Sequence, residues 1–164
     1  MGLIINKSIQ KMMVGYPTVS DKYNVAGGIL TGANAVQFGD LVKTSGTAGY
    51  FEKALNVATV ENIAGFVLAT NVKLAEGFPG TVTQVNPGEA FNLLINGFIA
   101  VQLDTGATLA KVTPNAKVYV ILATGKLTTA DKAELSKVVE LPGCVFTGIK
   151  ETQGAATVAE IFVK

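Results

Sequence analysis

Short runs rich in Val, Ile, Phe, Tyr and Thr recur along almost the whole chain, separated by Gly, Asn, Asp and Pro. This punctuation limits the chain to short strands joined by turns, and the 18 glycines suit the positive-φ turns and bulges that such a fold needs. The pattern predicts an all-β, Gly-rich barrel or sandwich. Its predicted strands are residues 23–30, 41–45, 50–54, 64–69, 80–85, 91–95, 98–103, 116–123, 144–149 and 157–163.

Two segments leave alternatives open. Asn96-Gly97 between two apolar runs is the sequence typical of a two-residue hairpin turn, although a bulge in one long bent strand would give a similar pattern. Residues 129–140 fit either one short helix or a long polar loop, because Asp131 and Glu134 could cap a helix that carries Val138 and Val139. The sequence therefore predicts at most one short helix.

The two halves of the chain share a pattern of glycine and apolar residues. Residues 49–54, 63–67 and 88–95 in the first half resemble residues 125–130, 141–146 and 154–162 in the second. The spacing is too long for a solenoid repeat. It predicts two similar β-units that together close one barrel.

The first 22 residues differ from the rest and predict an N-terminal arm ahead of a barrel domain at residues 23–164. Their apolar residues follow no helix or strand period, and Tyr16-Pro17 would end any helix. Apolar side chains exposed to water are costly, so we expect the arm to lie on its own barrel or on a neighbouring molecule. The apolar residues concerned are Ile4, Ile5, Ile9, Met12 and Met13.

The composition removes much of the chemistry that enzymes use. The chain has no His, no Arg and no Trp, and all thirteen of its basic residues are Lys. His-dependent nucleophiles and His-ligated zinc are therefore excluded, and the formal charge of +1 gives nucleic acid little to bind. No apolar stretch approaches the ~20 residues of a membrane span. We expect no cofactor, no metal, no nucleic-acid partner and no membrane partner.

One string resembles a catalytic motif. Asp104-Thr105-Gly106 follows an apolar run, as the catalytic Asp of a retropepsin-like aspartic protease does, but the same three residues are ordinary turn formers. The turn interpretation is favoured, and the chain is predicted not to be an enzyme. The single Cys144 lies in an apolar run and is predicted to be a small buried core residue.

The order of several segments resembles the capsid cement proteins, also called head decoration proteins, of tailed phages. The matching pieces are Gly15-Tyr16-Pro17 with Ser20-Asp21, then residues 35–42, 86–90, 93–101, 116–120 and 123–129, and finally residues 141–146, which begin Leu141-Pro142-Gly143. Each piece is a common β-pattern, so the likeness rests on their order. It extends over about nine-tenths of the chain and implies a β-barrel with an N-terminal extension.

The resemblance also implies a function. Such a protein would be a structural component of the virion on the outer surface of the capsid, made in the host cytoplasm, that binds assembled major capsid protein and bridges capsomers. Its copies would associate with one another, as trimers do in that family, and the arm residues Ile4, Ile5, Ile9, Met12, Met13 and Tyr16 would contact the capsid. The alternative is a carbohydrate- or receptor-binding β-module of a phage tail, which the lack of Trp disfavours.

Overall fold

The computed structural model describes residues 12–18, 23–69, 84–129 and 137–164, and in these ranges the protein is all-β, as predicted. Two 3-10 turns, η1 (Val60–Asn62) and η2 (Leu109–Lys111), are the helical elements of the described chain. The strands are β1 (Asn24–Leu30), β2 (Val36–Gln37), β3 (Leu41–Thr44), β4 (Tyr50–Lys53), β5 (Ile63–Leu68), β6 (Gln84–Val85), β7 (Ala90–Gln102), β8 (Lys117–Ile121), β9 (Lys126–Thr128), β10 (Val138–Gln153) and β11 (Ala156–Val163).

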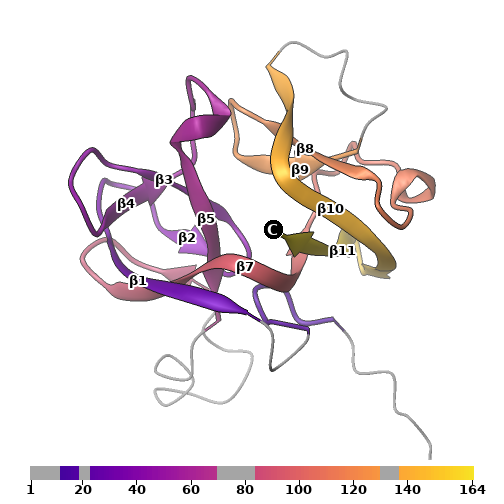
Figure 1. The fold of residues 1–164 in the computed structure, drawn as a ribbon, viewed down its shortest axis with the longest axis horizontal. Helices are drawn as coiled ribbons and strands as arrows, with labels where there is room; N and C mark the ends of the chain where they lie inside the picture. The colour runs from indigo at the N-terminus through magenta and orange to yellow at the C-terminus, as the bar shows by residue number, and fades with distance from the viewer. Residues whose placement is uncertain (1–11, 19–22, 70–83, 130–136) are drawn as a thin grey trace, which may run out of the picture.

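The first half of the chain closes a five-stranded barrel, which we call the first ring. Its strands pair in the order β1-β4-β3-β5-β7, and β7 returns to pair with β1. The pairing of β1 with β4 is parallel and the others are antiparallel. The first ring occupies the left of Figure 1.

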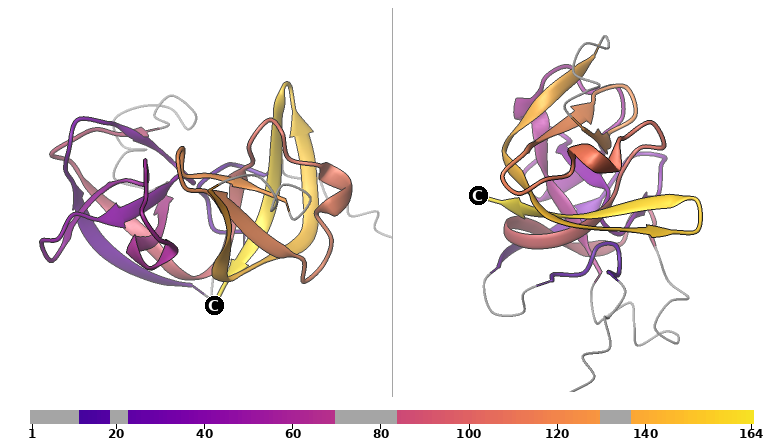
Figure 2. Two further views of the ribbon diagram at one scale, coloured as in Figure 1. Left: turned by 90° about the horizontal axis from the view of Figure 1, so that it is seen from above. Right: turned by 90° about the vertical axis from the view of Figure 1, so that its right-hand side faces the viewer.

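The second half repeats this arrangement on the other side of β7, forming the second ring. There the order is β7-β11-β10-β8-β9, and a parallel bridge from Leu103, just past β7, to Leu127 in β9 closes the circle. Figure 2 shows the two lobes side by side, joined through the long strand β7. The rings therefore share one strand.

The internal repeat predicted from the glycine pattern coincides with this topology. The paired segments fall on β4 and β9, on β5 and β10, and on β7 and β11, and the members of each pair hold equivalent places in the two rings. Even the one parallel contact recurs, β1 with β4 in one ring and Leu103 with Leu127 in the other. The two units do not close one common barrel, however. Each ring closes on its own, with β7 common to both.

Of the two alternatives at Asn96-Gly97, the hairpin is wrong and the long strand with a bulge is found, because these residues lie inside the continuous strand β7. A hairpin would pair the two halves with each other. Instead Leu94 faces Phe66 of β5, whereas Phe98 faces Phe162 of β11. Gly97 has a φ of 130°, which favours glycine, and it bends the strand where it passes from one ring to the next.

Most other predicted strands are confirmed, with different bounds. Val138 and Val139 belong to β10 rather than to a helix, and residues 130–136 lie outside the described part of the chain. The short strands β2 and β9 were not predicted. Val36–Gln37 has only two residues, and the Thr-rich stretch of β9 does not alternate.

Two apolar clusters fill the rings. Val42, Val67 and Leu93 lie in the core of the first ring, while the opposite faces of the same strands send Leu41, Phe66 and Leu94 into the larger core of the second. An ion pair adds to this contact, since Lys126 Nζ of β9 lies 2.9 Å from the Asp40 carboxylate, whose side chain is 12% exposed. The two rings are therefore packed as one body.

Candidate functional site

Residues 12–18 of the predicted arm are built into the sheet. The main-chain amide of Gly15 donates to the Ala100 oxygen at 2.8 Å, and the amide of Ala100 donates back to the Tyr16 oxygen at 3.3 Å. Pro17 forms a bridge with Ile99. This segment thus runs along the free side of β7, where that strand has left the first ring.

Glycine permits this close docking. Gly15 has a φ of +81°, and a Cβ there would lie 2.3 Å from the Phe38 Cβ. The start of the segment is held at its main chain, since the Met12 amide donates to Glu151 Oε1 at 2.8 Å and the Met12 oxygen accepts from Gln153 Nε2 at 2.5 Å. Both partners lie near the tip of the β10–β11 hairpin.

A groove of about 570 Å³ separates this segment from the outer face of the β10–β11 hairpin. Met13 and Ile149 are exposed at its edges, by 46% and 54%. We call it the arm groove. Its lining is mostly apolar and consists of Met12, Met13, Tyr16, Pro17, Thr18, Ile149 and Glu160.

A wide bulge shapes the wall of the arm groove. Phe146 pairs with Ile161 and Lys150 with Ala159, so residues 147–149 all stand opposite Glu160 alone. The bulge contains Gly148 at a φ of +93° and includes the exposed Ile149. On its other side, Glu160 is in register with Ala100 of β7. The small Ala100 side chain leaves space between Glu160 and the arm segment.

A second apolar surface covers the outside of β1, and we call it the β1 face. Val25 and Ile29 are exposed there by 45% and 37%, and Ile29 is in register with the exposed Tyr50 of β4. Ile95 is the extra residue of β7 at the bulge opposite Asn24 and Val25. Tyr23 precedes the strand and is also exposed. In Figure 1, β1 and the segment 12–18 both lie along the lower side of the molecule.

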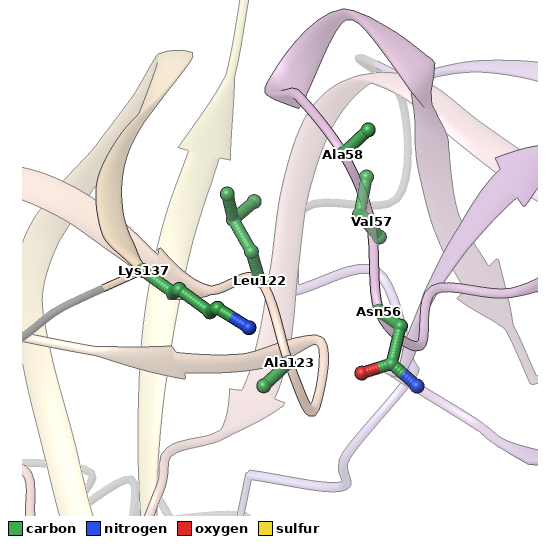
Figure 3. Close-up of a pocket in the computed structure, with 6 residues that line it drawn as sticks. All are labelled: Asn56, Val57, Ala58, Leu122, Ala123 and Lys137. Atoms are coloured by element: carbon green, nitrogen blue, oxygen red, sulfur yellow. The ribbon is translucent and has the colours of Figure 1, made fainter.

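A smaller hollow of about 300 Å³ lies at the seam between the rings. Figure 3 shows Asn56, Val57 and Ala58 on one side of it and Leu122, Ala123 and Lys137 on the other. The Val57 amide donates a hydrogen bond to the Leu122 main-chain oxygen at 2.9 Å, and the Asn56 amide donates one to the Ala123 oxygen at 3.2 Å. These two hydrogen bonds connect the two sides. Lys137 is the one charged residue in this lining, so no ion pair within the lining joins the two rings across the hollow.

The residues weighed for chemistry are occupied in structural roles. The Asp104 carboxylate accepts from the Gly106 amide at 2.9 Å, as expected of a turn. Burial raises the pKa of Cys144 to about 12, which keeps it a thiol at neutral pH. In the described ranges no group of acidic or thiol side chains is placed to hold a metal, and no helix there is long and apolar enough to cross a bilayer.

Three of the predicted contact residues, Met12, Met13 and Tyr16, meet at the arm groove. The other three, Ile4, Ile5 and Ile9, lie outside the described residues. Sequence reasoning missed Ile149 and Glu160. Strand alternation within 157–163 places Glu160 on the outer face, but nothing local in the sequence shows that residues 12–18 lie beside it.

Comparison with known proteins gives a consistent result. The family described as "Structural cement protein (E217 gp24/Pam3 gp6)" matches residues 5–164. Among solved structures, a chain from "The capsid of Myoviridae Phage XM1" superposes with a TM-score of 0.66 at 19% sequence identity, with 99% of this chain and 96% of that chain covered. At that identity the likeness establishes the fold. None of the curated proteins matches the sequence.

Proposed function

The chain belongs to the family of phage structural cement proteins, and from this premise we propose that it binds assembled major capsid protein on the outer surface of the head and bridges adjacent capsomers. The match over residues 5–164 carries the proposal. The protein acts by contact and without catalysis, in keeping with the use of Asp104 as a turn cap.

The distribution of exposed apolar side chains supports the same role. Seven large hydrophobic residues of the described chain are exposed, and they fall into two groups. Five form the β1 face, while Met13 and Ile149 belong to the arm groove. Exposed apolar groups gathered in this way mark surfaces that are covered in an assembly. We assign the capsid contact to the β1 face and to the edges of the arm groove, where Met13 and Ile149 are exposed.

Sedimentation with empty, expanded capsids tests the proposal. The wild-type protein should pellet with capsids and remain in the supernatant without them. Met13→Asp in the arm groove and Ile29→Asp on the β1 face should each weaken binding by at least about tenfold, because each places a charge in a contact that must lose its water.

Two variants serve as controls in the same assay. Ala58→Asp adds the same charge at the seam shown in Figure 3, and Asp104→Asn removes the carboxylate of the turn. Both should bind capsids as the wild type does. A wild-type protein that stays in the supernatant at saturating capsid would contradict the proposed function.

A further inference from the structure

The arm groove contains a carboxylate that nothing in the described chain neutralises. Glu160 is 6% exposed, its carboxylate has no hydrogen bond or ion pair within the described ranges, and the carboxylate oxygens open onto the groove rather than being sealed from water. Around it the lining comes from Met12, Met13, Tyr16 and Ile149. A carboxylate that opens onto a groove keeps its water while the groove is empty, but an apolar occupant removes that water, which is unfavourable unless the occupant supplies a cation. The groove is therefore shaped for an apolar occupant that carries one cation.

The N-terminal eleven residues of this same sequence have that chemistry. They read Met-Gly-Leu-Ile-Ile-Asn-Lys-Ser-Ile-Gln-Lys and include no acid. In an extended segment every second side chain faces the same way. Ile5, Lys7 and Ile9 would then face one side together, with the ammonium between two apolar side chains. This order matches a carboxylate set between apolar walls.

We propose that residues 1–11 of a second copy of this chain lie extended in the arm groove, with the Lys7 ammonium on the Glu160 carboxylate. The inference goes beyond the proposed function, which concerns the capsid, and specifies how copies of the chain would join one another. Exchange of a terminal segment between identical molecules is a low-cost route to an oligomer.

The geometry of the arm favours a second copy over the same chain. The Met12 main chain is bound to Glu151 and Gln153, so the described arm segment begins near the tip of the β10–β11 hairpin. Returning Lys7 to Glu160 of its own molecule would require the chain to reverse within residues 8–11. A β-turn uses four residues. The reversal would consume Ile9, which then could not lie extended beside Lys7.

Analytical ultracentrifugation of the full chain, without capsids, tests the proposal. The wild type should self-associate. Lys7→Glu and Glu160→Lys should each weaken association at least about tenfold, and the double variant should recover it. Gln10→Glu adds a negative charge on the opposite side of the extended segment from Ile5, Lys7 and Ile9 and should have little effect. Glu160→Gln keeps the shape of the side chain and should also weaken association, so a folding defect of Glu160→Lys would not obscure the result.

Mixing the two single variants separates exchange between molecules from folding back within one. In a mixture, the arm of the Lys7→Glu variant meets the groove of the Glu160→Lys variant with opposite charges, and so do the unaltered arm and groove of the two proteins. Association should therefore return at equal concentrations. Failure of the mixture to recover while the double variant does would overturn the second-copy assignment. A wild-type chain that remains monomeric would also overturn it. Neither result depends on capsid binding, which the sedimentation assay measures separately.

Discussion

Single glycines decide how closely the two rings approach. Gly125 ends the turn that leads into β9 and has a φ of +68°, and a Cβ there would lie 2.2 Å from the main-chain oxygen of Ala54 in the first ring. Its counterpart in the repeat, Gly49, has a similar φ of +79° but open space around it. The two positions therefore share a backbone requirement and differ in their neighbours.

This pair gives a residue-scale prediction. Gly49→Ala should lower the free energy of unfolding by about 1 kcal/mol, the cost of a left-handed φ for a residue with a Cβ. Gly125→Ala should cost roughly 2–4 kcal/mol, because the main chain of Ala54 has to move as well. Urea unfolding followed by circular dichroism measures both. Equal losses of unfolding free energy at the two positions would show that the Ala54 main chain moves aside at no energetic cost.

At the scale of elements, the described part of the predicted arm, residues 12–18, belongs to the sheet. Residues 12–18 share main-chain hydrogen bonds with β7 and with the end of β5, where the Ala69 amide donates to the Gly15 oxygen at 2.9 Å. The boundary at residue 22 came from the loss of periodicity. Periodicity does not detect a segment that adds one irregular, Gly- and Pro-containing strand to a sheet edge.

Two truncations compare the contribution of residues 1–11 to stability with that of residues 12–18. Removing residues 1–11 should leave the melting temperature nearly unchanged at low protein concentration. Removing residues 1–18 should lower the free energy of unfolding by roughly 2–4 kcal/mol, since each main-chain hydrogen bond lost contributes about 1 kcal/mol. Differential scanning calorimetry of both proteins provides the comparison. A large loss from the shorter deletion would mean that residues 1–11 pack on their own molecule.

Strand existence was largely predictable, whereas strand partners were not. Short runs of β-branched and aromatic residues between turn residues placed β1, β3, β4, β5, β8 and β11, although β3 and β5 are buried on both faces. Asn96-Gly97 misled because hairpin chemistry is local, while the partners of Leu94 and Phe98 lie in different rings. The arm groove was half predicted for a similar reason. Met13 and Tyr16 were predicted as contact residues from the sequence. Glu160 was not, because it reaches the groove only through the packing of residues 12–18 beside β11, near the other end of the chain.

The whole molecule should unfold as one unit despite its two rings. β7 belongs to both, and the larger apolar cluster includes Phe66 of the first ring together with Ile161 of the second. Calorimetry should therefore give a single transition in which the calorimetric and van't Hoff enthalpies agree. Two separated transitions, or an enthalpy ratio well above one, would show that the rings are independent domains.

The shared strand also determines how the molecule resists tension. If one ring is attached to one capsomer and the other ring to its neighbour, a force that separates them runs along the covalent backbone of β7. To yield, β7 has to slide out of a whole ladder, such as its pairs with β11 from Gly97 to Gln102. Those bonds are loaded together in shear and cannot open one at a time. Two barrels joined by a linker would extend under the same force, whereas this fold transmits it as a rigid tie.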